Sequence, residues 1–129
     1  MAGRDAVFVL WGERCDEALA VAWVSRLRAE GRRVYLVGVS GRRVRGKFGV
    51  GLVVDIGLDE ALALAAEAAL VVIPCGEDAL EAVRRDPRFD EFLAQAGRVG
   101  ARFLAHPLAV EGLMGLLPGA LVSAVADGG

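Results

Sequence analysis

The sequence is poor in the residue types that carry most enzyme chemistry. Its 129 residues include a single histidine, His106, and two cysteines, Cys15 and Cys75. None of its serines follows the Gly-x-Ser-x-Gly pattern of a serine nucleophile. A serine-triad mechanism is therefore excluded, and any catalytic role falls to the histidine, the two thiols and neighbouring carboxylates.

The low cysteine content also argues against a disulfide-stabilised secreted protein. Cys15 and Cys75 lie far apart in the sequence, and the chain is long enough to form a hydrophobic core without cross-links. We therefore expect no disulfide framework and treat each cysteine as a thiol.

Long apolar runs are absent, although hydrophobic residues make up 55% of the chain and the mean hydropathy is +0.46. Glycine or a charged residue interrupts every run before the roughly eighteen residues that a membrane-spanning helix needs. The apolar run at residues 6–10 is too short for a secretory signal. We therefore expect a cytoplasmic protein with no membrane partner, and the apolar surplus predicts a sheet that is covered on both faces.

Positive charge is scarce as well, because the net charge is −2. This balance argues against a nucleic-acid partner, which needs a concentrated basic surface. The basic residues at 42–47 lie in a segment that approaches the pattern of a phosphate-binding loop. That loop requires Ser or Thr after its lysine to hold magnesium, and here Phe48 follows Lys47. We therefore expect a solvated turn at this segment and no nucleotide or other cofactor.

Strand-like and helix-like segments alternate along the chain. We expect strands at residues 6–10, 33–39, 52–55, 70–73, 103–105 and 120–125, the last at a sheet edge. Helices are predicted at residues 16–31, 58–68, 78–85, 87–97 and 110–117, and a turn or hairpin at 40–51. This alternation predicts one α/β domain over residues 1–129, with a mostly parallel sheet and helices on both faces.

Ligands of such sheets bind at the carboxyl ends of the strands, where three short segments meet. These segments are the loop at residues 11–15, Cys75 with Gly76, and His106 with Pro107. Cys75 is either a small packed side chain or a thiolate stabilised by backbone N–H groups. His106 is likewise either structural or part of a site.

Glu17 follows the first of these segments and also has two interpretations. Its carboxylate favours the dipole at a helix start, or it lies at the mouth of the sheet, where it can hydrogen-bond to a nearby thiol or imidazole. Glu17 forms a zinc site with Cys15, Cys75 and His106 only if all four side chains converge, so no metal is expected.

Several segments together resemble the ThiJ/PfpI family of the class I glutamine amidotransferase-like superfamily. They are RLRAEGRRV at residues 26–34, GKFG at 46–49, VVD at 53–55, LVVIPCG at 70–76 and the segment 80–87, which ends in RRDP. The resemblance covers roughly residues 6–119. It implies a flavodoxin-like three-layer sandwich that is usually oligomeric, with a cysteine nucleophile at a strand–turn–helix elbow.

In this family a glutamate from the loop after the first strand completes the site. Carried over residue by residue, the family's histidine falls on His106. The nucleophile falls on Ala105, or on Pro107 with a slip of two residues. The glutamate falls on Leu19 without gaps and on Glu17 with a shift of two residues.

Two further departures from the family pattern affect the same region. Cys75 replaces the first glycine of the family's Pro-Gly-Gly turn, whose backbone amides contribute to the site, and Gly76 keeps the second. The sequence also stops soon after the predicted elbow helix, where the family continues with a final strand and helix.

The resemblance and its departures lead to a first functional hypothesis. The chain is a catalytically degenerate ThiJ/PfpI-like domain, a pseudoenzyme that acts through binding or assembly, because neither Ala105 nor Pro107 can act as a nucleophile. The site residues are then vestigial: Cys75, His106 and Glu17 in the catalytic positions, with Cys15, Gly76, Ala105 and Pro107 around them.

Two alternatives remain. In the first, Cys75 or Cys15 is a relocated thiol that acts with His106, in a hydrolase, a glyoxalase-type enzyme or a redox sensor. In the second, the same pocket binds a small molecule or a metal. The apolar surplus and the short carboxyl-terminal end also predict a homodimer or larger assembly, which would cover an exposed edge or face of the sheet.

Overall fold

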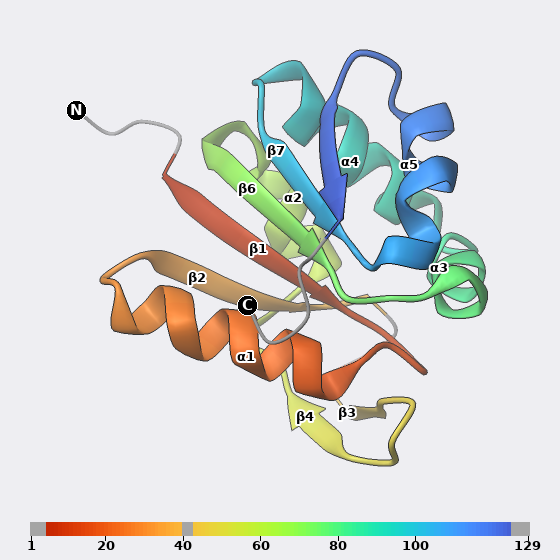
Figure 1. Cartoon of the computed structure of the whole chain (residues 1–129). Helices are drawn as coiled ribbons and strands as arrows, with labels where there is room; N and C mark the ends of the chain where they lie inside the picture. Colours follow the sequence, from red (N-terminus) through yellow and green to blue (C-terminus); the bar gives the residue numbers. More distant parts are fainter. Residues whose placement is uncertain (1–4, 40–42, 125–129) are drawn as a thin grey trace.

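A six-stranded parallel sheet with the order β5-β2-β1-β6-β7-β8 forms the centre of the computed structural model, which describes residues 5–39 and 43–124 (Figure 1). Its strands are β1 (Ala6–Trp11), β2 (Arg33–Gly38), β5 (Ile56–Gly57), β6 (Ala68–Ile73), β7 (Arg102–Ala105) and β8 (Leu121–Ala124). The helices are α1 (Glu17–Ala29), α2 (Leu58–Ala63), α3 (Glu77–Val83), α4 (Pro87–Arg98) and α5 (Val110–Leu116), with 3-10 helices η1 (Ala65–Glu67) and η2 (Pro107–Ala109). The predicted α/β fold with a mostly parallel sheet is confirmed.

Strand β1 is the most deeply buried element of the sheet. It pairs with β2 on one side and with β6 on the other, and all six of its residues have no exposed surface. A strand that is covered on both faces has no solvent side, which explains why its sequence is a solid apolar run instead of an alternation.

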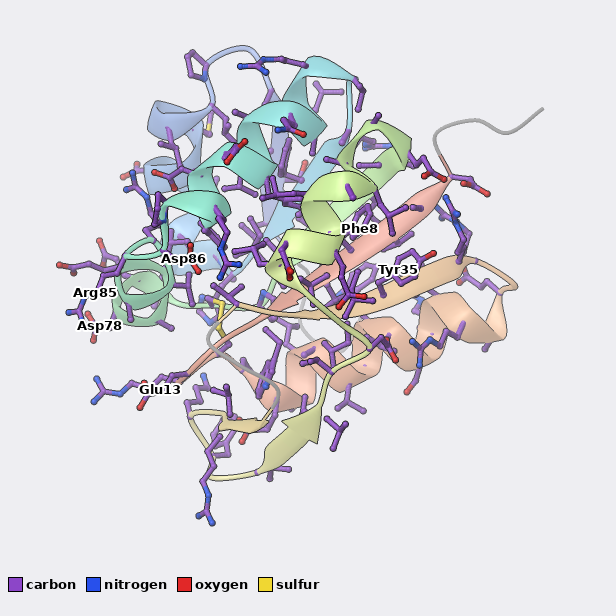
Figure 2. All side chains as sticks on the ribbon, turned by 180° about the vertical axis from the view of Figure 1, so that it is seen from behind. Phe8, Glu13, Tyr35, Asp78, Arg85 and Asp86 are labelled. Carbon is purple, nitrogen blue, oxygen red and sulfur yellow. A yellow bond between two sulfur atoms is a disulfide. The ribbon has the colours of Figure 1, made fainter. Side chains whose placement is uncertain are left out.

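Helices cover both faces of the sheet, and aromatic side chains join the layers on one of them. The Phe8 ring stacks on Tyr35 of β2 with 5.5 Å between centroids, and Phe92 of α4 meets it edge-on at 5.1 Å. Figure 2 shows Phe8 and Tyr35 on this side, where α2 and α4 also lie, and Figure 1 shows α1 along the opposite face over β1 and β2. The three-layer arrangement follows from these contacts.

Helix α1 begins and ends where the sequence predicts. The carboxylate of Asp16 accepts a hydrogen bond from the Leu19 backbone N–H at 3.0 Å, which satisfies one of the free donors of the first turn. After the helix, Gly31 adopts a φ of +82°, a left-handed conformation that glycine tolerates best. The chain then turns directly into β2.

A separate antiparallel hairpin lies beside the start of α1 (Figure 1). Its strands are β3 (Arg43–Arg45) and β4 (Gly51–Val53), which pair from Arg43 with Val53 to Arg45 with Gly51. The sequence predicts a strand at 52–55, and the structure corrects its placement because β4 belongs to this hairpin and β5 supplies the edge of the parallel sheet. Residues 40–42 of the predicted turn lie outside the described residues.

Strand β8 occupies the other edge, as predicted, and pairs with β7 in parallel. Its residues are half-buried or exposed, and Leu121 is 65% exposed. Among the described residues, no helix is long and apolar enough to cross a membrane.

Candidate functional site

Three turns meet at the carboxyl ends of β1, β6 and β7, the edge where the sequence predicts a site. The loop after β1 is tied to the turn after β6 by a hydrogen bond from the Asp16 backbone N–H to the Pro74 carbonyl, 2.6 Å. The turn after β7 is tied to β6 by a bond from the His106 N–H to the Ile73 carbonyl, 3.1 Å. Backbone hydrogen bonds therefore hold these turns side by side.

Cys15 and Cys75 form a disulfide at this edge, which corrects the expectation that they remain thiols. Each cysteine follows a strand of the parallel pair β1 and β6, so strand pairing brings the two residues together although 60 positions separate them. Both cysteines are buried, at 0% and 1% exposure. Figure 2 shows the bridge as the yellow bond close to the ends of the strands.

A cavity of about 510 Å³ opens above the three turns. The residues on either side of Cys15, Arg14 and Asp16, line it, as does Gly76 after Cys75. The complete lining consists of Arg14, Asp16, Gly46, Lys47, Gly76, Glu77, Asp78, Ala79, His106 and Leu108. Of the predicted site residues, only His106 and Gly76 are therefore part of its wall.

The His106 side chain faces its own turn with one of its two nitrogens. Nδ1 accepts a hydrogen bond from the Leu108 N–H at 3.2 Å and caps η2. An Nδ1 that accepts must carry no proton, so the neutral ring holds its proton on Nε2. The neutral imidazole can thus donate from Nε2, while its lone pair is used within the turn.

The turn around His106 is also relaxed. A nucleophile elbow is a sharp, strained strand-to-helix turn. Here His106 has a φ of −54°, and the only residue other than glycine with a positive φ in residues 5–39 and 43–124 is Arg14, at +67°. Ala105 is completely buried at the end of β7, and Pro107 starts η2 and is exposed. The chain therefore runs from strand through turn to helix as in a nucleophile elbow, but none of Ala105, His106 and Pro107 has a positive φ.

The Glu17 carboxylate binds the hairpin loop, and among the described residues no hydrogen bond joins it to His106. Its carboxylate is buried and accepts from the Phe48 N–H at 3.0 Å and the Val50 N–H at 2.7 Å. Burial disfavours the charged form, but these backbone hydrogen bonds outweigh it and hold the pKa of Glu17 below its usual value. The carboxylate is therefore an anchor for the loop between β3 and β4.

Gly46 makes this anchor possible. A Cβ at Gly46 would collide with the Glu17 carboxylate, so only glycine fits between the hairpin and the start of α1. The next residue, Lys47, donates its N–H to the Cys15 carbonyl at 3.0 Å, and its Nζ lies 3.3 Å from the Asp16 carboxylate. The hairpin loop is thus joined to the loop after β1.

The possible zinc site from the sequence is not formed. Cys15 and Cys75 are joined to each other, and Glu17 binds backbone amides of the hairpin. Within the described part of the chain, no group of three or more histidine, cysteine or acidic residues is arranged to hold a metal ion.

The DJ-1/PfpI family model matches residues 5–110, which contain the sheet edge and all three turns. The chain belongs to the DJ-1/PfpI family. The family suspected from the sequence segments is therefore confirmed. No curated protein sequence matches the chain.

Solved structures show the same fold as this DJ-1/PfpI domain. A mutant of a DJ-1 superfamily protein from Salmonella typhimurium is 22% identical with a TM-score of 0.75, over 92% of this chain and 74% of that one. Oxidised Toxoplasma gondii DJ-1 is 24% identical with a TM-score of 0.74, over 88% of this chain and 63% of that one. Drosophila melanogaster DJ-1beta is 18% identical with a TM-score of 0.71, over 98% and 75%.

Sequence reasoning missed most of the charged wall of the cavity. Arg14, Lys47, Glu77 and Asp78 line the cavity and were not among the predicted site residues. Arg14 and Lys47 lie in loops that only the folded chain brings together, through a bond from the Arg14 N–H to the Arg45 carbonyl at 3.1 Å. Glu77 and Asp78 had a usable signal, because they directly follow Gly76 at the expected edge.

We predict that the Glu17→Gln substitution destabilises the domain near neutral pH by about 1–3 kcal/mol, because an amide oxygen replaces a charged acceptor of two backbone bonds. A group with a lowered pKa contributes its stability above its unfolded-state pKa and loses it as the pH falls through the folded-state pKa. The difference between the two proteins should therefore shrink below about pH 4.5, the ordinary value for glutamate. Urea unfolding across this pH range measures it, and a difference independent of pH would contradict the assignment.

Gly46→Ala is expected to destabilise the domain by about 1–3 kcal/mol, since the added methyl group displaces the Glu17 carboxylate from its two amide donors. Gly51→Ala is the matched control, because a Cβ there meets no atom within 4 Å. The cost of Gly46→Ala should fall in a Glu17→Ala background, which double-mutant unfolding experiments would detect. Additive costs would show that the two residues do not interact.

Proposed function

We propose that this DJ-1/PfpI domain is a pseudoenzyme that acts through binding and assembly, without the cysteine chemistry that the family resemblance implies. One observation carries the proposal: both cysteines of the chain are joined in a buried disulfide, so no thiol is available beside His106. The family's nucleophile position falls on Ala105 or Pro107, and neither side chain can attack a carbonyl group.

The state of His106 supports the same proposal. A general base must offer an unprotonated nitrogen to the nucleophile that it activates. The free nitrogen of the neutral ring, Nε2, carries the proton because Nδ1 accepts from Leu108. His106 is therefore better suited to donate a hydrogen bond to a bound ligand than to remove a proton.

The charges around the cavity favour a small polar ligand that bears both signs of charge. Arg14 and Lys47 line one part of the wall, and Glu77 and Asp78 at the start of α3 line another. Lys47 is paired with Asp16 in the same wall, so the charges that face a ligand are those of Arg14, Glu77 and Asp78. A ligand with a carboxylate or phosphate and an amine would pair with both signs of charge, which a purely apolar ligand could not do. We therefore propose a small-molecule ligand at this site, with no cofactor.

Exposed apolar side chains beside the cavity support homo-oligomerisation. Val53 of β4 is 78% exposed and Phe48 of the hairpin loop is 64% exposed. Val50 of the same loop is 51% exposed, and Val21 on the outer side of α1 is 46% exposed. We name Val21, Phe48, Val50 and Val53 the hairpin patch. Since α1 and the hairpin adjoin, a second copy of the chain that covers this patch would remove four large side chains from water.

A cytoplasmic location is part of the proposal as well. In that reducing compartment a disulfide is usually transient, catalytic or redox-sensing, so the oxidation state of Cys15 and Cys75 becomes a question of its own.

A second candidate function is a cysteine-dependent enzyme that is active when the bridge is open. The observation that favours it is the position of the bridge, whose flanking residues line the same cavity as His106. Reduction would place two thiols at this edge, and one of them would take the role that Ala105 cannot fill.

We expect the oxidised protein to show no turnover of methylglyoxal or of chromogenic peptides above that of a Cys15→Ser/Cys75→Ser variant. The reason is that a nucleophilic mechanism loses several orders of magnitude in rate without its thiolate. Initial-rate assays of both proteins make the comparison. Turnover that the double substitution abolishes would refute the pseudoenzyme, and turnover that appears only after reduction would support the second candidate.

The Val53→Asp substitution is expected to convert a dimer or larger assembly into monomers, because a carboxylate in the hairpin patch cannot be buried without a partner. Met114→Asp is the control, since Met114 is 54% exposed on α5, away from the patch. Sedimentation velocity at micromolar concentration distinguishes the species. A monomeric unmodified chain would contradict the proposed assembly.

A further inference from the structure

The Cys15–Cys75 bridge joins two loops that are already held together. Strands β1 and β6 pair from Ala6 to Val9, and the Asp16 N–H to Pro74 carbonyl bond continues the contact past the strand ends. Both strands lie in the buried core, which does not depend on a covalent link between the loops. The bridge can therefore open without separating the elements that it connects.

The loop that carries Cys15 has a strained backbone conformation that the bridge helps to hold. Arg14, directly before Cys15, has a φ of +67°. This left-handed conformation is unfavourable in free energy for any L-residue that has a Cβ. Such strain persists only where the surroundings enforce it. Here the enforcing contacts are the bridge, the Arg14 N–H bond to Arg45 and the Lys47 N–H bond to the Cys15 carbonyl.

The bridge is also linked to the wall of the cavity. Arg14, Asp16 and Gly76, which flank the two cysteines, are lining residues. On the other side, His106 donates its N–H to Ile73, two residues before Cys75. A change in the position of either cysteine therefore moves residues that a ligand would contact.

From these observations we infer that Cys15 and Cys75 form a redox switch, in which thiol–disulfide exchange with a dithiol reductant changes the shape of the cavity. Because both cysteines are buried, at 0% and 1% exposure, the loops at this edge must first open locally. One thiolate of the dithiol then attacks a bridge sulfur, the S–S bond breaks, and a mixed disulfide forms. The second thiol of the reductant then displaces the remaining protein sulfur. Two electrons pass from the dithiol to the bridge, and the two cysteine sulfurs take up two protons. This inference goes beyond the proposed binding role, because it assigns a regulatory reaction to the bridge.

The lone histidine provides a direct test, since an untagged protein gives a single set of imidazole NMR signals. Dithiothreitol serves as the dithiol under native conditions, iodoacetamide counts the free thiols, and far-UV circular dichroism monitors the fold. We expect two labelled cysteines per molecule, an unchanged circular dichroism spectrum and shifted His106 signals. Oxidised glutathione should return the signals to their first position.

A glutathione buffer separates this switch from a structural disulfide, which resists reduction by that couple. We expect a mixture of open and closed bridges whose ratio follows the glutathione ratio. Three results would overturn the inference: a bridge that opens only in denaturant, a reduced protein that unfolds, or His106 signals that stay unchanged on reduction.

The Cys15→Ser/Cys75→Ser variant is the matched control. Its His106 signals should coincide with those of the reduced protein and should not respond to dithiothreitol. A response would show that the reductant acts elsewhere and would overturn the inference. The measurements on the unmodified chain decide the question if this variant does not fold.

Discussion

The parallel pairing of β1 with β6 is the constraint on which the rest of the site depends. It places the ends of two buried strands next to each other, so the loop after β1 and the turn after β6 must share one small volume. The 2.6 Å bond from Asp16 to Pro74 and the Cys15–Cys75 bridge both follow from this arrangement. The cavity is the space that remains above these two turns and the turn that carries His106.

The buried carboxylate of Glu17 stabilises the scaffold in the region where the sequence left both a structural and a catalytic role open. A buried charge is stable only when enough donors replace its lost water, and the Phe48 and Val50 amides supply them. Gly46 leaves the room for this contact. Through the hairpin loop, Glu17 also fixes Lys47, so its influence on the cavity is indirect but extends to a charged wall residue.

The sequence predicted the fold better than the site, for physical reasons that particular residues make clear. Periodicity and end signals such as Asp16 and Gly31 are local, and they located most strands and helices. The Cys15–Cys75 pairing, by contrast, depends on which strands become neighbours, and strand order is not written in local pattern. The hairpin strand at Gly51–Val53 was assigned to the wrong sheet for the same reason. The contacts of Glu17 could not be predicted because its donors lie 31 and 33 residues away in the chain, in a loop that looked like a solvated turn.

The oxidation state of the bridge and the protonation of His106 together determine what this edge can do. With the bridge closed neither cysteine offers a free thiol, and a neutral imidazole whose Nδ1 accepts from Leu108 presents its N–H on Nε2, so in the proposed function both groups serve recognition. Opening the bridge supplies thiols but does not by itself make His106 a base, because the Leu108 N–H still occupies Nδ1 unless the turn rearranges. Catalysis by a cysteine–histidine pair at this edge would therefore require two changes, a reduced bridge and a released imidazole, whereas the proposed binding role requires neither. This difference is the physical reason for placing binding first among the possible functions.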